Sequence, residues 1–149
     1  MGQQQLQQLS QELQEIQEQI EGLQANVESI QQEKTDADEA IDALNTLESG
    51  STVQVPLGGG AYLRATIEDI DEAIVELGAD YAAEFEQDDA IDTLENKKEN
   101  LDDEIEEVNS EIAELESKSS ELEQQAQQLQ QQAMQQQMGQ MGQGQGPDE

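Results

Sequence analysis

Carboxylates are the most numerous groups in this sequence that could carry out chemistry. The acidic run Asp102, Asp103, Glu104, Glu106 and Glu107 supplies candidate general acids and bases. Acid and base catalysis needs two such groups held in a shielded pocket with separated pKa values. The apolar spacing around the run indicates a two-helix rod, which offers no such pocket. We therefore interpret the acidic runs as solvated faces and expect no enzyme activity, hydrolase activity included.

Two shorter segments resemble other kinds of site. In "VPLGGGAYLRATI" the triple glycine fails as a phosphate loop, because Leu63 stands where a third spaced glycine is needed and no Gly-Lys-Ser or Gly-Lys-Thr follows. The segment "DADEAIDALNTL" starts at Asp36 like a calcium loop but has Ile41 for the glycine and Leu47 for the closing glutamate. Cysteine and histidine are absent. We expect no catalytic residue, no cofactor and no metal site.

The charge balance narrows the classes of partner. The chain has 36 Asp and Glu against 5 Lys and Arg, a net charge of −31. Such a chain repels nucleic acid and anionic membranes, so neither is expected as a partner. Molar salt shortens the screening length to about 3 Å and relieves the self-repulsion, which suggests a halophilic cytoplasm. No apolar run of membrane-spanning length and no targeting signal is seen, so we expect a cytoplasmic protein.

Two long series of apolar residues predict two coiled-coil helices. Spacings alternate between three and four residues, which defines the inward positions of a heptad repeat. The first series is Leu6, Leu9, Leu13, Ile16, Ile20, Leu23, Val27, Ile30, Lys34, Ala37, Ile41 and Leu44. The second is Ile91, Leu94, Lys98, Leu101, Ile105, Val108, Ile112, Leu115, Ser119, Leu122, Ala126 and Leu129. This regularity argues against a disordered acidic protein.

These series place an N-terminal helix in residues 1–49 and a C-terminal helix in residues 88–133, paired antiparallel. Gly50 suits the left-handed conformation after a last helical turn, and Asp88 or Asp89 suits the start of the second helix. Lys34 and Lys98 occupy inward positions at similar heights. Two interpretations stay open for them. They extend to neighbouring carboxylates, or they also set the register of the pair.

The segment between the helices, residues 50–87, predicts two β-hairpins. Alternating residues mark strands at 52–57, 61–67, 73–77 and 81–85, the first two joined by a three-glycine loop. Pro56 has no N–H to donate, so it belongs at an edge or a bulge. Isolated hairpins are marginal in water. We therefore expect the strands to find partners in other chains and to close an intersubunit β-barrel.

The fold class expected is α+β, a long antiparallel two-helix coiled coil with two central β-hairpins. The residues expected to support subunit assembly are Val53, Val55, Pro56, Leu57, Gly58, Leu63, Ile67, Val75, Leu77, Gly78, Tyr81 and Phe85. The last segment, residues 134–149, is rich in Gln, Met and Gly and is expected to be disordered. Its methionines suit adhesion to apolar surfaces, and low-complexity drift is the alternative.

The central segment also resembles a known family. Val55, Pro56, Leu57 and Gly58, followed by Val75, Gly78 and Tyr81, resemble the hairpin motifs of the archaeal-type prefoldin α subunit, with the resemblance covering roughly residues 5–130. The resemblance implies a hexamer with prefoldin β subunits, two α and four β. It also implies ATP-independent capture of unfolded polypeptides and their delivery to the group II chaperonin.

Exposed apolar residues at the free ends of the two helices could bind an unfolded chain at many weak contacts. The residues expected to bind clients are Leu6, Leu9, Leu13, Leu122, Leu129, Met134 and Met138. The alternative function is a structural coiled-coil scaffold or tether that oligomerises through its hairpins and binds no unfolded chain. The hairpin pair favours the chaperone subunit, because a simple tether needs only heptads.

Overall fold

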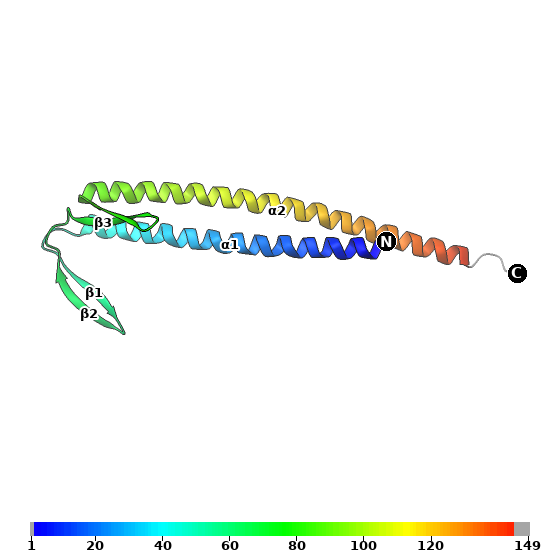
Figure 1. The fold of residues 1–149 in the computed structure, drawn as a ribbon, viewed down its shortest axis with the longest axis horizontal. Coiled ribbons are helices and arrows are strands. Elements are labelled where there is room, and N and C mark those ends of the chain that lie inside the picture. The colour runs from blue at the N-terminus through cyan, green and yellow to red at the C-terminus, as the bar shows by residue number, and fades with distance from the viewer. Residues whose placement is uncertain (1, 145–149) are drawn as a thin grey trace. The chain divides into compact units, whose positions relative to one another are not determined.

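A computed structural model describes residues 2–144 of the chain. Its elements, in chain order, are α1 (Gly2–Thr46), β1 (Thr52–Gly58), β2 (Ala61–Thr66), β3 (Ala73–Gly78), β4 (Tyr81–Phe85) and α2 (Gln87–Gly144). Two long helices therefore flank two antiparallel hairpins, β1–β2 and β3–β4, as the sequence predicts (Figure 1). The chain divides into two compact units. Among the described residues, the terminal unit comprises 2–28 and 106–144, and the hairpin unit comprises 29–105.

Heptad packing holds the terminal unit together. Each predicted inward position in this unit is buried or half-buried, and the outward positions between them are largely exposed. The buried cluster and the side chains packed against it are Ile16, Ile20, Ile112, Leu122, Leu9, Leu13, Leu23, Val27, Val108 and Leu115. Full burial of one such aliphatic side chain contributes roughly 1.5 to 3 kcal/mol. The predicted antiparallel seam is confirmed.

The hairpin unit has its own core, which includes one of the hairpins. Val75 of β3 is 6% exposed and packs with Ile41 of α1 and with Ala90 and Leu94 of α2. Figure 1 shows β3 lying beside α1 in this unit. Cross-strand pairing places Val75 opposite Ala83, so one face of the β3–β4 hairpin turns inward. The helices thus cover the inner face of the β3–β4 hairpin, whereas its outer face and its open strand edges stay available to other chains.

Both hairpins turn through residues with positive φ. Gly58 pairs with Ala61, so the first loop consists of Gly59 and Gly60 rather than three glycines. Their φ angles of 60° and 80° suit the type I′ turn of a two-residue hairpin. In the second loop Ala79 and Asp80 adopt φ angles of 50° and 62°, which side-chain-bearing residues adopt at a cost.

Pro56 lies at a position in β1 where its missing N–H interrupts the strand pairing least. The pairing of β1 with β2 shifts register between Pro56 and Gly58, so a bulge directly follows the residue that has no N–H. Within the two-stranded sheet, both strands are also edges. The prediction of an edge or bulge position for Pro56 is confirmed.

Helix ends differ from the sequence expectation at two places. α1 ends at Thr46, and Gly50, with φ of 91°, instead serves a turn in which the Ser51 N–H donates to the Glu48 carbonyl at 3.0 Å. α2 begins at Gln87, so Asp88 and Asp89 lie inside its first turn. There they oppose the positive end of the helix dipole but do not precede the helix as caps.

The junction between the helices depends on Gln87. Its backbone N–H donates to the Asp71 carboxylate at 3.2 Å, which satisfies a first-turn donor of α2 from the linker between the hairpins. Its side-chain amide donates to the carbonyls of Leu44 and Leu47 at the end of α1. One glutamine thus satisfies unpaired groups at the start of one helix and the end of the other.

The segment expected to be disordered from residue 134 is helical as far as Gly144. Gln, Ala and Met all have good helix propensity, and extending an existing helix requires no new nucleus. Low apolar content therefore did not end the helix. The remainder of the predicted tail, residues 145–149, lies outside the described residues.

We expect Ala79→Gly to stabilise the chain by about 1 kcal/mol, because glycine adopts a left-handed turn position without the Cβ clash. Urea unfolding followed by circular dichroism in molar KCl measures the change. Ala82→Gly is the matched control in β4, where glycine should destabilise the strand. Equal destabilisation by both variants would contradict the assigned turn.

Candidate interaction surfaces

Both hairpins carry large apolar side chains that the chain leaves exposed. On β1–β2 these are Val55, Leu57, Tyr62 and Leu63, and on β3–β4 they are Ile74, Leu77 and Tyr81. Ile74 and Tyr81 are each 74% exposed, and Leu57 is 64% exposed. Each hairpin is a separate two-stranded sheet with unpaired edges. Exposed apolar faces combined with open strand edges are typical of a surface that pairs with other chains.

The residues expected to support assembly fall into two groups. Most lie on exposed strands or turns, or are half-buried at the base of the β1–β2 hairpin: Val53, Val55, Pro56, Leu57, Gly58, Leu63, Ile67, Leu77, Gly78 and Tyr81. Val75 and Phe85 instead pack in the core of the hairpin unit. Sequence reasoning missed Tyr62 and Ile74. Ile74 lies next to the inward Val75 on β3, so its side chain points to the opposite face of the strand. An apolar residue at such an outward position was the sequence signal that could have identified it.

Backbone hydrogen bonds attach the β1–β2 hairpin to its neighbouring linkers. The Gly50 N–H donates to the Ile67 carbonyl at 2.7 Å, and the Ile67 N–H donates to the Ser51 carbonyl at 2.9 Å. The Ile70 N–H donates to the Ser49 hydroxyl at 3.0 Å. Neither buried cluster contains a residue of β1 or β2. This hairpin is therefore anchored at its base by polar contacts, which leaves its apolar side chains available.

Two ion pairs cross between the helices in the hairpin unit. Lys34 Nζ of α1 lies 2.7 Å from Asp102 Oδ1 of α2, and Lys98 of α2 pairs with Asp38 of α1. Each aspartate follows the lysine of its own helix by four residues, so the two pairs are reciprocal. The interpretation that both lysines extend to neighbouring carboxylates is confirmed. A heptad slip of either helix would separate both pairs, so they also favour one register.

The pairing changes the acidity of Lys98. The hydrogen bond to Asp38 raises the pKa of the Lys98 ammonium above its ordinary value, partial burial opposes that rise, and the charge of Asp38 reinforces it. The neighbouring Lys97 Nζ donates to the Glu76 carbonyl of β3 at 3.2 Å. Adjacent lysines thus serve different purposes, since one joins the two helices and the other ties the β3–β4 hairpin to α2.

The residues expected to bind clients lie in the terminal unit and differ in exposure. Leu122 is buried in the seam, and Leu9 and Leu13 pack against the same cluster. Leu6 and Leu129 are half-buried. Met134 and Met138 of α2 are 69% and 77% exposed. The methionines are therefore the members of the expected set that present most apolar surface to a partner.

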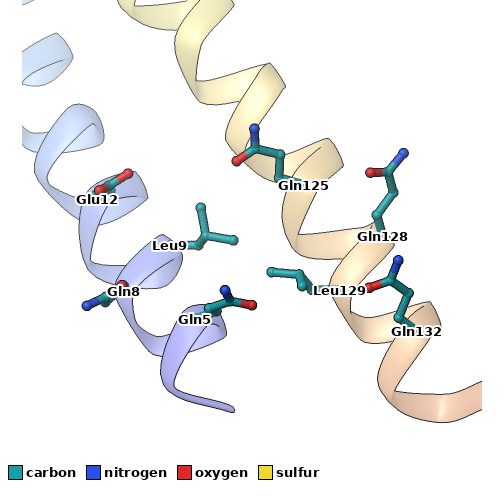
Figure 2. A pocket seen from close by; sticks show the side chains of 8 residues that line it. All are labelled: Gln5, Gln8, Leu9, Glu12, Gln125, Gln128, Leu129 and Gln132. Carbon is teal, nitrogen blue, oxygen red and sulfur yellow. The ribbon is translucent and has the colours of Figure 1, made fainter. Parts of the chain in front are cut away.

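Leu9 and Leu129 face each other across an open groove between α1 and α2 (Figure 2). The groove has a volume of about 350 Å³. Its other lining residues are Gln5, Gln8, Glu12, Gln125, Gln128 and Gln132. Glutamines thus surround the two leucines, a feature that the sequence analysis did not single out.

Across residues 2–144, three or more Asp, Glu, His or Cys side chains nowhere gather in a way that could hold a metal ion. Over that range, no helix combines the length and apolar character needed to cross a bilayer.

The fold defines a class of protein known from solved structures. A chain of filamentous PFD from Methanocaldococcus jannaschii, determined by cryo-EM, matches this one with a TM-score of 0.67. The match has 27% sequence identity and covers 78% of this chain and 98% of that chain. Two long helices flanking two small hairpins are thus an established architecture.

The sequence assigns the family within that class. The model of the prefoldin subunit family matches residues 16–132, and the chain belongs to this family, which is a family of chaperones. A prefoldin subunit alpha of Halorubrum lacusprofundi is 67% identical over 67% of this chain and 66% of its own length. One from Haloarcula marismortui is 69% identical over 47% of this chain and 46% of its own length. The matched region spans about half to two thirds of these halophile relatives.

The raised pKa of Lys98 leads to a test at alkaline pH. A raised folded-state pKa gives a stabilisation that is complete below the unfolded value of about 10.4 and is lost as pH rises through the folded value. Lys98→Arg keeps its charge throughout this range. We expect the stability of the natural chain relative to this variant to be constant from pH 7 to about 10 and to fall above that.

Urea unfolding by circular dichroism at a series of pH values measures this difference. Lys118→Arg serves as the control for the lysine-to-arginine substitution itself, because no ion pair of Lys118 is found within residues 2–144. If the stability of the natural chain relative to Lys98→Arg stayed constant up to pH 11.5, the Lys98–Asp38 contact would not contribute as described.

Proposed function

We propose that this chain is the α-type subunit of an ATP-independent holdase that binds unfolded polypeptides and passes them to a group II chaperonin. It acts in a cytoplasmic hexamer with prefoldin β subunits, two α and four β. The family assignment and the similarity to α subunits of halophilic archaea support this function. The exposed apolar face of the hairpins is the single observation that carries the proposal, because it requires other chains.

Assembly uses the outer surfaces of both hairpins. Val55 and Leu63 are cross-strand partners, and both are exposed. Ile74 and Tyr81 offer further apolar area on the β3–β4 hairpin. Pairing of these strands with strands of neighbouring subunits satisfies the open edges and buries the apolar side chains at once. The inward Val75 packs against α1 and α2 and thereby holds the β3–β4 hairpin in position for this pairing.

Client binding uses the terminal unit. Met134 and Met138 are separated by one helical turn, so they lie on one face of α2. Thioether side chains are flexible and polarizable, which suits binding to many different apolar sequences. Several subunits presenting such weak sites in one assembly gain affinity through multivalency. This arrangement needs no nucleotide, because binding and release depend on many weak contacts.

The assembly surface is tested by adding charge to one face of the β1–β2 hairpin. We expect the double variant Val55→Asp, Leu63→Asp to abolish complex formation with co-expressed β subunits, because two carboxylates cannot be buried unpaired in a sheet interface. Gln54→Asp, Thr66→Asp adds the same charge to the opposite face of the same hairpin and should reduce assembly less. Size-exclusion chromatography with light scattering in molar KCl reports the mass. Equal assembly by both variants would contradict the proposed face.

Client binding is tested with the assembled complex and a denatured client protein whose aggregation is followed by light scattering. Met134→Gln, Met138→Gln should weaken suppression of aggregation severalfold, because it removes the exposed apolar surface while keeping a good helix former. Met134→Leu, Met138→Leu is the control and should retain suppression. If the natural complex failed to suppress aggregation at all, the chain would be a scaffold or tether and not a holdase subunit.

A further inference from the structure

Sulfur is concentrated in one short stretch of this chain. Cysteine is absent, and three of the four methionines, Met134, Met138 and Met141, lie in residues 134–141 near the end of α2. Within the described residues, both buried clusters consist of Ile, Leu, Val, Ala and Phe. The exposed large apolar residues of the two hairpins are Val, Leu, Ile and Tyr. A reagent that attacks thioethers would therefore change this stretch and leave the helical seam and the hairpin faces chemically unaltered.

Met134 and Met138 are open to a reagent in solution, since their exposed fractions are 69% and 77%. They are separated by one turn of α2, so both thioethers lie on the same face of the helix. In Figure 1 the end of α2 extends beyond the start of α1, so the last turns of α2 have no helix of the same chain beside them. A peroxide needs only to reach the sulfur lone pair. This degree of exposure therefore makes both methionines oxidisable without an activating group.

We propose that Met134 and Met138 form an oxidation site at which peroxide switches off client binding and reduction restores it. The inference rests on the proposed holdase function and concerns the regulation of that same surface. The oxidant is hydrogen peroxide. Each thioether sulfur donates an electron pair to one peroxide oxygen, so that a sulfur–oxygen bond forms while the oxygen–oxygen bond breaks. The sulfur is oxidised to the sulfoxide, and the peroxide is reduced and leaves as water.

The sulfoxide removes the property that suits these side chains to client binding. Oxidation converts a flexible apolar side chain into a polar one. An apolar group of a client can then cover the oxidised face only by burying a sulfoxide oxygen without a hydrogen-bond donor, which costs free energy. Residues 124–144 contain no Asp, Glu, Lys or Arg, so two sulfoxides are a large change in the polarity of this neutral segment.

Reduction can reset the site. Methionine sulfoxide reductases regenerate the thioether, with the electron pair supplied by two thiols that become a disulfide and the sulfoxide oxygen released as water. Separate enzymes act on the two sulfoxide epimers, so both are needed for full recovery. Such an enzyme must reach the sulfur, and the exposure of Met134 and Met138 allows this.

The distribution of sulfur makes this site a switch and not a point of general damage. Val55 and Leu63 of the assembly face and Ile16 and Ile112 of the seam contain no sulfur, so peroxide leaves them unchanged. The complex should therefore stay assembled while its client-binding face is oxidised. Leucine at positions 134 and 138 would offer a similar apolar area without this sensitivity, which provides the matched variant.

The test compares the natural complex with the complex that carries Met134→Leu, Met138→Leu, each before and after treatment with hydrogen peroxide. Both contain the same β subunits, and the variant keeps Met1 and Met141, so a difference in their response arises from the two substituted thioethers. Catalase and gel filtration remove the peroxide before guanidinium-denatured citrate synthase is added as the client. Peptide mass spectrometry follows sulfoxide formation at each methionine, and light scattering verifies that each complex stays assembled.

The measured quantity is the concentration of complex that halves the aggregation of the client, taken after oxidation relative to before. We expect this ratio to be roughly fivefold or more for the natural complex and less than about 1.5-fold for the variant. The loss should follow sulfoxide formation at Met134 and Met138 in time. Incubation with both types of methionine sulfoxide reductase and dithiothreitol should return the natural complex to its starting value.

Two outcomes would overturn the proposal while leaving the holdase function in place. One is unchanged suppression of aggregation by the natural complex after mass spectrometry has verified both sulfoxides. The other is an equal loss in the natural and variant complexes, because the sensitive groups would then lie outside Met134 and Met138. A natural complex that failed to suppress aggregation before any oxidation would instead contradict the holdase function itself, and the switch with it.

Discussion

The scarcity of apolar side chains is the constraint on which the rest of this structure depends. With one Phe, two Tyr and no Trp in 149 residues, the chain cannot build a rounded core. Its aliphatic residues form a heptad seam between two helices in the terminal unit and a separate small cluster beside the β3–β4 hairpin in the hairpin unit. Most of the exposed large apolar residues lie on the two hairpins, and the others are Met134 and Met138 of α2.

In a chain with this strong negative charge, most of the few basic side chains form contacts between structural elements. Three of the five basic residues, Lys34, Lys97 and Lys98, form contacts that join elements of the hairpin unit. Solvent-exposed ion pairs contribute little individually, so their reciprocal arrangement matters more for register than for stability. The acidic residues are distributed along the helices but are absent from residues 2–11 and 124–144.

Periodic features of the fold could be predicted from the sequence, and single long-range contacts could not. The heptad positions, the four strands and the bulge beside Pro56 all follow from local spacing and from the missing N–H of proline. The contacts of Gln87 with Asp71 and Leu44 join residues far apart in the chain and leave no periodic signal. The inward packing of Phe85 depends on how the β3–β4 hairpin meets the helices, which strand alternation does not determine. The helical continuation to Gly144 was missed because a low apolar content was taken as a sign of disorder.

The same distinction applies to the interaction surfaces. Alternation along the strands identified Val55, Leu63 and Tyr81 as available residues, and the structure leaves all three exposed or largely so. The heptad series placed Leu122 at an inward position, but it did not show whether α1 reaches far enough to cover that residue, and Leu122 was therefore also expected to bind clients. The groove around Leu9 and Leu129 could not be recognised either, since its glutamines come from two segments over a hundred residues apart.

Hydrogen exchange of the β1–β2 backbone amides, measured by mass spectrometry in molar KCl, tests most directly whether this hairpin is completed between chains. The account predicts rapid exchange across residues 52–66 in the isolated chain, while the helical seam stays protected. In the complex with β subunits the same amides should become strongly protected. Strong protection of residues 52–66 in an isolated monomer would contradict the account, because the hairpin would then be stable without a partner.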